Sequence, residues 1–367
     1  MENGKISPRQ LAFLMTNVVL ATVIIFMPQL GARELGQDGW LSAIIATLWG
    51  ILVVLPLVAL GERYPAMTFV EYLPLVLGKP LGKILGAFYV FWFLATGGFI
   101  LRTFSMFLSI TIMPSTPVSV FSITLLVLVY YAVKRGIEAW VRVSEVLLPL
   151  IILSILMVMI LPYNQMDLGR LLPVGEHSMS SLLAGSLLSG SWRGEFVLIG
   201  MFLPLLADNR HTVRNLYSAV IAIGVILVGT EIATVAVFGA VNTGQFEFPF
   251  FSLARMISLA RVFDRVEVLI VMTWVVGIFI KLCAFLYCST RSFVQVCGFT
   301  SSKHFLFPVA LLMFAISDNV ASNVSEVTDF MVKVWPGFAL LSFEMLIPWL
   351  VYLVASLRSG LRRGEGQ

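Results

Sequence analysis

The sequence predicts an all-α integral membrane protein, and three observations lead to that prediction. Hydrophobic residues make up 59% of the 367 residues, and charged residues only 12%. A soluble domain has about 45–50% apolar and about 25% charged residues. The apolar residues also form segments of about 20 residues, the length a helix needs to cross a bilayer, along the whole chain. Residues 1–367 are therefore expected to be a single polytopic membrane domain.

Ten membrane helices are predicted, so both termini are expected on one side of the bilayer. Of the 24 lysines and arginines, 15 lie on the predicted side of the termini, 6 on the other side and 3 inside helices. Cytoplasmic loops carry an excess of Lys and Arg, so the termini are expected in the cytoplasm. The predicted helices cover about 9–30, 40–60, 82–110, 117–134, 139–161, 181–207, 212–240, 265–290, 304–318 and 333–357.

Two connections between the predicted helices are apolar but too short to span a membrane. Thr68–Gly78 follows the second helix, and Phe250–Arg261 follows the seventh. Both are expected to lie at the membrane interface. Since they hold the same place in the first and second sets of five helices, they indicate a five-plus-five inverted repeat, with a first repeat of about 9–161 and a second of about 181–357.

The sixth predicted helix is interrupted by Leu187-Leu-Ser-Gly-Ser-Trp-Arg-Gly-Glu-Phe196. An ionised side chain at the bilayer centre costs about 2.5–3.5 kcal/mol or more, so this pattern has no reason to face lipid. It indicates a broken helix whose exposed backbone lines a binding site. The predicted ligand-binding residues in it are Gly190, Ser191, Trp192, Arg193, Gly194 and Glu195.

The inverted repeat requires a matching break in the first helix. Asn17, Thr22 and Pro28 fall within that helix, and Pro28 removes one main-chain hydrogen bond from it. No glycine accompanies them. Ala21 and Thr22 are predicted to form the second half of the ligand site.

Charged side chains inside the predicted helices are expected to face the interior and to pair. They are Arg102, Glu145, Arg193, Glu195, Glu231, Lys281 and Glu344. Glu195 would bind a ligand ammonium or hold the break in shape, or it would form a buried ion pair with Lys281 or Arg193. Arg193 would receive a ligand carboxylate as a two-pronged donor, or it would neutralise Glu195.

Four further charged residues are predicted to act in gating or in ion pairs. Arg102 and Lys281 occupy equivalent helices of the two repeats, where a cation can gate the site, replace a bound sodium ion or form a structural salt bridge. Glu231 and Glu344 are either proton sites or hydrogen-bond partners of neighbouring helices.

No catalytic residue, metal site or cofactor is predicted, and the chain is not expected to be an enzyme. Zinc-protease, serine-hydrolase and nucleotide-binding motifs are absent from the sequence. The spacing of Cys283, Cys288 and Cys297 matches no redox or zinc motif. The basic stretch Arg358–Arg363 is expected to contact anionic membrane lipid, and no nucleic-acid partner is expected.

Several sequence blocks together resemble a known family. They are Ile6-Ser-Pro-Arg-Gln-Leu-Ala-Phe-Leu14, Gly36-Gln-Asp-Gly-Trp40, Gly194-Glu195 with the apolar run to Leu203-Pro204, and Trp274-Val-Val-Gly-Ile-Phe-Ile-Lys-Leu-Cys-Ala-Phe-Leu-Tyr287. In this order they resemble the endospore-germination permeases, which are the B subunits of spore germinant receptors.

The resemblance implies a sensor in the inner membrane of a bacterial spore, with the inverted-repeat fold of the amino acid–polyamine–organocation transporters. It also implies A and C receptor subunits as partners and a small, amino-acid-like germinant as ligand. Two features depart from the family pattern. Leu20-Ala-Thr-Val23 replaces a glycine-rich break, and Trp192-Arg193 occupies the break of the sixth helix.

Three functions are compatible with these observations. The first is a germinant-sensing subunit that binds its ligand between the first and sixth helices and triggers germination. The second is a stand-alone proton- or ion-coupled amino-acid transporter. The third is a membrane scaffold that assembles partner subunits without binding a ligand.

Overall fold

A computed structural model describes residues 4–257 and 266–364, and over these ranges the chain is helical, with no β-sheet. The long helices are α1 (Pro8–Leu35), α2 (Gly39–Arg63), α4 (Lys79–Thr111), α5 (Val118–Arg135), α6 (Ile137–Ile160), α9 (Thr212–Phe238), α12 (Val266–Cys297) and α15 (Ile347–Gly364). The shorter helices are α3 (Phe69–Leu77), α7 (Met179–Arg193), α8 (Ile199–Phe202), α10 (Ala240–Gln245), α11 (Pro249–Arg255), α13 (Leu306–Asn319) and α14 (Val324–Lys333).

Turns of other helical types complete the chain. The 3₁₀-helices are η1 (Gly36–Asp38), η2 (Tyr163–Gln165), η3 (Leu168–Leu171), η4 (Gly194–Leu198) and η5 (Leu203–Leu205). One π-helix, η6 (Pro336–Leu346), leads directly into α15. Two of these turns, η4 and η6, contain Glu195 and Glu344, so both interruptions carry a predicted site residue.

A helix or helical run covers each of the ten predicted segments. Seven stretches within the described ranges are long and apolar enough to span a membrane, and the first of them, Pro8–Arg63, contains both α1 and α2. An eighth is possible if α13 and α14, which meet at 102°, form one broken span. The protein is thus a multi-pass membrane protein, while the number of ten crossings and the side of the termini stay predictions.

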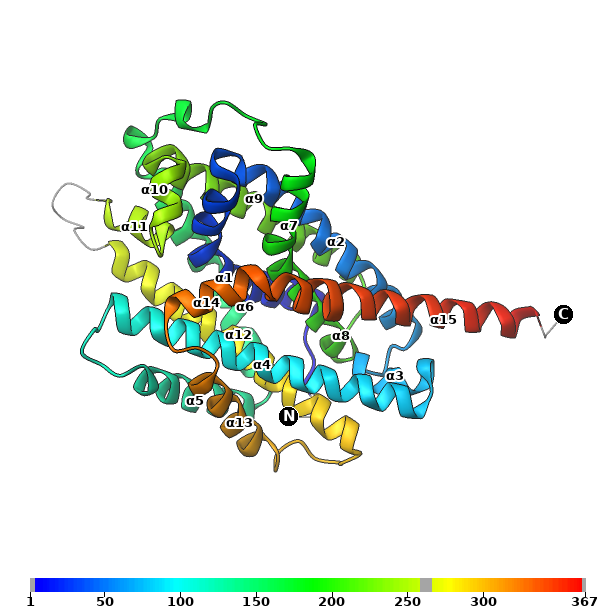
Figure 1. Cartoon of the computed structure of the whole chain (residues 1–367). Coiled ribbons are helices and arrows are strands. Elements are labelled where there is room, and N and C mark those ends of the chain that lie inside the picture. Colours follow the sequence, from blue (N-terminus) through cyan, green and yellow to red (C-terminus); the bar gives the residue numbers. More distant parts are fainter. Residues whose placement is uncertain (1–3, 258–265, 365–367) are drawn as a thin grey trace.

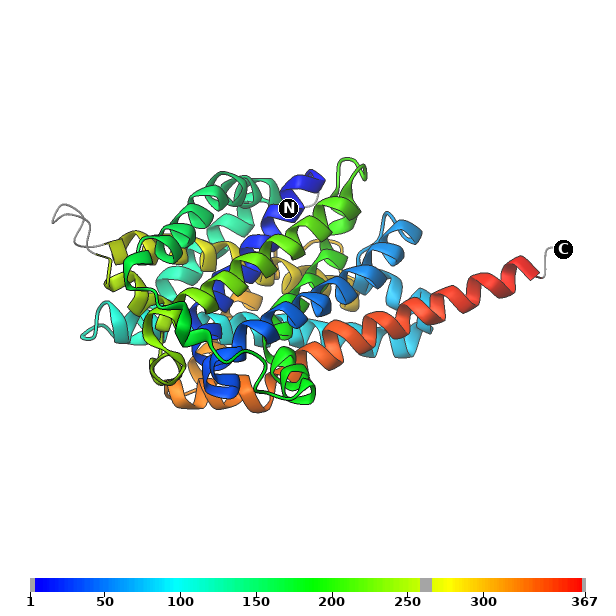
Figure 2. The same cartoon turned by 90° about the horizontal axis from the view of Figure 1, so that it is seen from above.

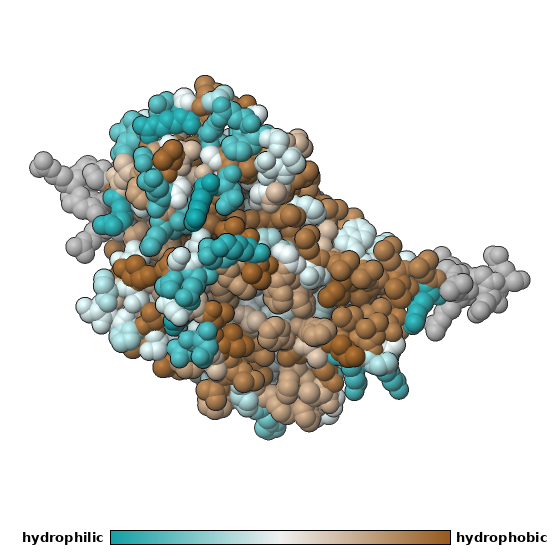
Figure 3. Space-filling model, viewed as in Figure 1, coloured by the Kyte–Doolittle hydropathy of each residue, from teal (hydrophilic) through white to brown (hydrophobic). Residues whose placement is uncertain are grey.

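The helices surround α1, which is buried along nearly its whole length (Figures 1 and 2). It packs against α9, α12, α6 and α7. On the outside the pattern is reversed, because α5 and α13 expose apolar side chains such as Val127 and Phe307. In Figure 3 apolar side chains cover much of the face in view, and hydrophilic ones gather at the top, around the connection between α6 and α7. Such a surface is expected where lipid is the solvent.

The predicted break in the first helix is not present. The whole of α1 is one continuous helix, and Pro28 lies inside it. A proline removes one main-chain donor and crowds one preceding turn, while the neighbouring hydrogen bonds remain. Packing on all sides and the lack of a glycine near Leu20–Val23 keep the helix intact.

The sixth segment changes its helical type without unwinding. Regular α7 ends at Arg193, and η4, α8 and η5 follow in succession. Gly194 has φ −61° and ψ −22°, which is ordinary right-handed helical geometry. The predicted break is therefore a switch to tighter 3₁₀ hydrogen bonding, a feature that often marks a functional hinge when it occurs within a helix.

Both predicted interfacial connections contain a short helix. One is α3, which begins at a capping box formed by Thr68 and Glu71. The other is α11, and residues 258–261 of that predicted segment lie outside the described residues. Each helix buries aromatic side chains, among them Phe69 in α3 and Phe250 in α11. These helices thus pack into the protein along one face.

The segment before α1 is joined to the end of the sixth helical run. The Ile6 amide donates to the Leu205 carbonyl over 3.0 Å, and the Ala207 amide donates to the Ile6 carbonyl over 2.9 Å. The next residue, Ser7, caps α1 by accepting a hydrogen bond from the Gln10 amide. The starting point of α1 is thus fixed to the end of η5.

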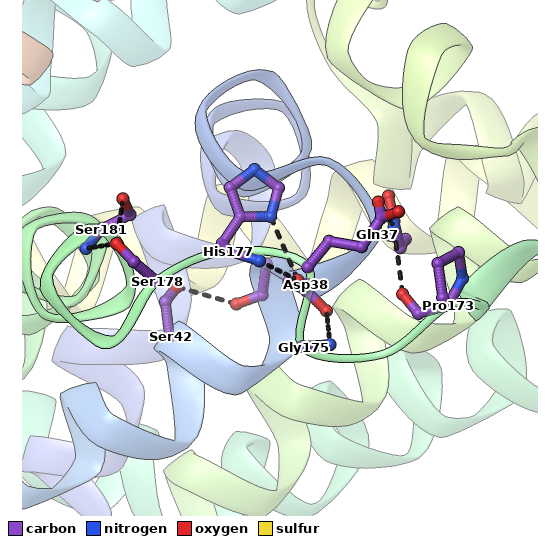
Figure 4. Close-up of polar contacts among 10 residues, drawn as sticks. Gln37, Asp38, Ser42, Pro173, Gly175, His177, Ser178 and Ser181 are labelled. Carbon is purple, nitrogen blue, oxygen red and sulfur yellow. Dashed lines mark hydrogen bonds and ion pairs between the residues drawn. The ribbon is translucent and has the colours of Figure 1, made fainter.

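A buried aspartate attaches the long connection between α6 and α7 to the turn between α1 and α2 (Figure 4). The Asp38 carboxylate, which has no exposed surface, accepts hydrogen bonds from the main-chain amides of Gly175 (2.8 Å) and His177 (3.1 Å). The His177 ring lies 3.0 Å from the same carboxylate. Beside it, the Gln37 side chain donates to the Pro173 carbonyl over 3.1 Å. This Asp38 anchor accounts for Gln37 and Asp38 in the Gly36–Trp40 block.

Replacing Asp38 by Asn is predicted to loosen this connection at neutral pH. Burial alone would raise the pKa of Asp38, but the hydrogen bonds from Gly175 and His177 outweigh it and hold the pKa below its ordinary value. The carboxylate therefore stabilises the fold above the unfolded-state pKa of about 3.9, and this contribution is lost as the pH falls through the folded-state value. Hydrogen bonds to a charged group contribute about 1.5–3 kcal/mol, so the Gly175 and His177 amides should exchange with deuterium faster in D38N.

The matched control is Asp208→Asn, because Asp208 is exposed and its carboxylate accepts only a local hydrogen bond from the Arg210 amide. That variant should leave exchange in residues 161–178 unchanged. The difference between wild type and D38N should also shrink at low pH. Equal exchange in wild type and D38N at neutral pH would show that Asp38 does not hold the connection.

Candidate functional site

The centre of the protein contains a buried ion pair that joins three helical segments. The Lys281 ammonium on α12 lies 2.7 Å from a carboxylate oxygen of Glu195 on η4. It also donates to the hydroxyl of Thr22 on α1 over 2.6 Å. Lys281 has no exposed surface, and the Glu195 side chain is only 2% exposed. We call this arrangement of Thr22, Glu195 and Lys281 the Lys281 clasp.

The clasp contains one of the two ion pairs that were predicted as alternatives for Glu195. Of the two ion pairs considered for it, the structure contains the pair with Lys281. Removing one partner of a buried pair costs about 3–5 kcal/mol, because the other charge remains without compensation. The pair therefore holds η4, α1 and α12 at a fixed separation, and it places two predicted ligand-binding residues, Thr22 and Glu195, side by side.

A small cavity lies against the clasp. Ten residues line it: Thr22, Phe26, Thr96, Phe99, Ile100, Thr103, Trp192, Glu195, Met331 and Trp335. The cavity offers a volume of about 20 Å³ to the centre of a water molecule, which is room for about one water. The space in this central cavity is therefore far smaller than an amino acid.

Its lining combines a few polar groups with large apolar walls. The hydroxyls of Thr22, Thr96 and Thr103 and the carboxylate of Glu195 are the polar groups. The Thr103 hydroxyl is buried and has no hydrogen-bond partner among the described residues. Ligand sites commonly have this composition, in which apolar walls supply contact area and a few polar groups fix orientation.

Aromatic rings close the cavity between α4 and the segment that precedes η6. Phe99 stacks on Trp335 with ring centroids 5.8 Å apart, and it contacts Phe330 at 5.1 Å. Phe26 of α1 meets Phe248 at 5.7 Å. Of these rings, Phe26, Phe99 and Trp335 line the cavity.

Arg193 is buried, but it does not line the cavity. Its guanidinium donates to the carbonyl and hydroxyl oxygens of Ser189 and, over 3.1 Å, to the Ala43 carbonyl of α2. Its Nε has no partner in the described part of the chain. Arg193 therefore joins α7 to α2 in this conformation, and it does not form the predicted ion pair with Glu195.

Three further predicted binding residues, Ala21, Gly190 and Ser191, lie in contacts within or between helices. Ala21 faces Gly277 of α12, and Ser191 donates a hydrogen bond back to the Leu188 carbonyl in its own helix. A Cβ at Gly190 would lie 2.7 Å from the Trp49 ring of α2. Gly190 thus allows the close approach of α7 and α2, while Trp192 lines the cavity.

Two further buried carboxylates, Glu344 and Glu231, have no hydrogen-bond donor among the described residues. Glu344 of η6 lies against Gly194, where a Cβ would come within 1.8 Å of its Oε2. Glu231 of α9 lies against Gly31 and Gly39, at the turn that carries the Asp38 anchor. Within the described ranges neither carboxylate has a hydrogen-bond partner. Hydrogen bonds to neighbouring helices, the alternative to proton sites, are not observed for either residue.

Arg102 lies apart from the cavity and pairs with the α13–α14 corner. Its Nε donates to the Ala321 carbonyl over 2.8 Å, and its Nη1 lies 3.8 Å from the Asp318 carboxylate. This geometry corresponds to the structural salt bridge among the predicted alternatives. In residues 4–257 and 266–364, no cluster of three or more His, Cys, Asp or Glu side chains forms a metal site.

Sequence reasoning missed the part of the cavity that comes from α4 and from the segment around α14. One signal was available, since Thr96, Phe99, Ile100 and Thr103 follow the helical spacing i, i+3, i+4, i+7 and therefore share a face of α4. No comparable signal marked Met331 and Trp335. They reach the cavity only because α14 folds back across the bundle after the 102° corner.

Comparisons with known proteins agree with this architecture. A family model described as "Spore germination protein" matches residues 5–324. Spore germination protein KB of Bacillus subtilis (strain 168) is 25% identical over 97% of this chain and 95% of its own length. Spore germination protein XB of Bacillus anthracis is 26% identical over 71% of this chain and 72% of its own length.

The fold is also found in a solved structure of distant sequence. The crystal structure of MhsT in complex with L-phenylalanine superimposes with a TM-score of 0.64 at 14% identity, over 95% of this chain and 98% of that chain. The shared fold agrees with the predicted transporter class. The inverted repeat within this chain stays a prediction.

Replacing Glu195 by Gln, or Lys281 by Met, is predicted to lower the free energy of unfolding by about 3–5 kcal/mol each, because either change leaves one buried charge alone. The double variant should be less destabilised than the sum of the single variants. Denaturant titration of the purified protein in detergent micelles gives the coupling between the two positions.

An exposed ion pair of similar distance provides the control. Glu138 and Arg142 lie 3.0 Å apart on α6, with side chains 43% and 69% exposed. Their coupling should be only about 0.3–0.5 kcal/mol. A coupling of that size at Glu195 and Lys281 would mean that the Lys281 clasp does not hold the helices together.

Proposed function

This chain belongs to the family of spore germination proteins, and we propose that it is the germinant-sensing membrane subunit of a spore germinant receptor. The central cavity beside the Lys281 clasp is the ligand site in this proposal. Its location between α1, α4 and η4 is the observation that carries the proposal, because two of its polar groups, Thr22 and Glu195, also join α1 and η4 to Lys281 of α12.

The cavity's chemistry favours a small amphipathic ligand of the amino-acid type. Phe26, Phe99 and Trp192 offer apolar contact area to a side chain, while Glu195 and the buried Thr103 hydroxyl offer polar partners to its head group. A ligand ammonium would share the Glu195 carboxylate with Lys281. Binding would thereby weaken the clasp that now closes the site.

Signalling follows from the closed state of the cavity. A space of about 20 Å³ excludes the ligand, so binding requires a second conformation in which the Phe99–Trp335 contact is open. A ligand shifts such an equilibrium only as far as its affinity for the two conformations differs. We propose that A and C subunits detect the open conformation in the spore inner membrane, with the termini of this subunit in the cytoplasm.

The experiment uses a sporulating host that carries Glu195→Gln in this chain. Spores are exposed singly to each of the twenty L-amino acids, and germination is followed by the loss of optical density. The germinant concentration for half-maximal response is expected to rise about tenfold or more, equivalent to about 1.4 kcal/mol of binding free energy. Phe99→Ala should change the preference among apolar germinants.

Glu138→Gln is the control, since Glu138 is exposed and far from the cavity along the chain. Immunoblots of spore membranes separate loss of response from loss of protein. An unchanged concentration dependence in E195Q spores, with normal protein levels, would exclude this cavity as the germinant site. Loss of response only where the protein is missing would favour the scaffold function.

Stand-alone transport is the second candidate, because an enclosed cavity flanked by buried carboxylates is also an arrangement that moves a solute across a membrane. Purified protein in liposomes separates the two functions. Concentrative uptake of a radiolabelled amino acid without other subunits would favour transport, and saturable binding without uptake would favour sensing.

A further inference from the structure

Glu344 is the buried carboxylate that neither the clasp nor the cavity uses. It lies in the π-helix η6 and has no exposed surface. Both of its carboxylate oxygens lack a hydrogen-bond donor among the described residues. Leaving an ionised carboxylate in such a setting is costly, since neither water nor a donor stabilises the charge. The side chain therefore requires either a counter-charge or a proton.

The charged neighbours of Glu344 do not supply a free counter-charge. Glu195 of η4 and Lys281 of α12 are close enough to interact with it electrostatically, as is the phenol of Tyr89 on α4. Lys281 already forms its ion pair with Glu195. The other segments packed on η6 are α2, α7, α14 and α15. Of these, α2 has no charged residue from Gly39 to Gly61, and the guanidinium of Arg193 in α7 donates to Ser189 and Ala43. The charged side chains of α14 (Glu326, Asp329 and Lys333) and Arg358 of α15 are exposed.

A count of the buried charges leads to the same conclusion. Apart from Asp38, which pairs with His177, the fully buried ionisable acids and bases of the described chain are Arg193, Glu195, Glu231, Lys281 and Glu344. Lys281 neutralises Glu195 in an ion pair, and the charge of Arg193 acts on Glu231 through space, with no hydrogen bond to its carboxylate. The two cations thus balance the charges of Glu195 and Glu231. Glu344 is a third carboxylate, for which no buried cation remains among the described residues.

We infer that Glu344 is a reversible proton-binding site and that it holds a proton in the conformation described. A proton suits the space available, because the carboxylate already lies against the main chain of Gly194 and a proton adds almost no volume. With the proton bound, the buried charges sum to zero. Without it, the interior contains one uncompensated negative charge within reach of the Lys281 clasp.

Release of the proton would act on the clasp through Lys281. An ionised Glu344 would compete with Glu195 for the ammonium group and weaken its contacts with Glu195 and Thr22. Proton binding at Glu344 therefore favours the closed clasp, and proton release favours its opening. The link from clasp opening to germination rests on the proposed function, whereas proton binding at Glu344 does not.

The test is infrared spectroscopy of the full-length protein reconstituted in lipid, with no ligand added. An un-ionised carboxylic acid has a carbonyl stretching band that ionised carboxylates lack. Wild type at neutral pH is expected to show this band from a buried group, with an intensity of one carboxyl per chain, and the band should disappear as the pH is raised. Glu344→Gln should remove the band, while Glu231→Gln should leave it unchanged because the charge of Arg193 acts on Glu231 and favours its ionised form.

A second variant keeps the test decisive if Glu344→Gln does not fold. In Gly194→Ala the added Cβ would lie 1.8 Å from Oε2, so the Glu344 carboxyl must move and its band should shift in frequency. The backbone at Gly194 is ordinary helix, which alanine tolerates. Circular dichroism confirms the folding of each variant.

Three results would overturn the proposal: no such band in wild type at neutral pH, a band that survives in folded Glu344→Gln, or a band that is removed by Glu231→Gln. Loss of the wild-type band when sodium replaces a bulky organic cation in the buffer would also overturn it, because a metal cation would then occupy the site. These spectra need no germinant, so their failure and a failure of the germination experiment are distinguishable.

Discussion

The ion pair between Lys281 and Glu195 is the interaction on which the centre of this protein depends. Both groups are buried where an unpaired charge would cost several kcal/mol, so each fixes the position of the other. Because Lys281 belongs to α12 and Glu195 to η4, the pair determines how these segments lie, and the Thr22 hydroxyl adds α1 to the same contact. A cavity that shares Thr22 and Glu195 with the pair cannot change shape without disturbing it.

Two irregular helices meet beside this ion pair, and their contact explains a glycine. The 3₁₀ turn η4 begins at Gly194, and the π-helix η6 presents Glu344 to it. Both helical types depart from regular α hydrogen bonding, and both recur at functional positions. A side chain at position 194 would displace the Glu344 carboxyl, so glycine allows this close approach and does not serve an unusual backbone conformation. The interruption of the sixth helix thus allows η4 to pack closely against η6.

The cavity and the family relationship point to the same role from independent directions. Membership in the spore germination family comes from the sequence along most of the chain, and the fold shared with a protein solved with bound L-phenylalanine comes from the structure. Neither identifies a ligand for this chain. The apolar walls made by Phe26, Phe99 and Trp192 do restrict the choice, since they favour a ligand that buries an apolar group beside a few polar partners.

The sequence by itself determined the membrane class, the position of nearly every helix and the charged residues of the interior, because hydrophobic length and the cost of buried charge are local properties that can be read from composition. It also singled out Thr22, Trp192, Glu195 and Lys281, which the structure brings to the cavity or to the ion pair beside it. Only the tertiary structure decided which charges meet. Glu195 forms an ion pair with Lys281, 86 residues away in the sequence, and Arg193 donates hydrogen bonds to Ser189 and Ala43. Tertiary packing also keeps α1 continuous through Pro28, and it places Met331 and Trp335 at the cavity. Such contacts depend on how helices far apart in sequence pack against one another, and a single chain's local pattern contains no information about that packing.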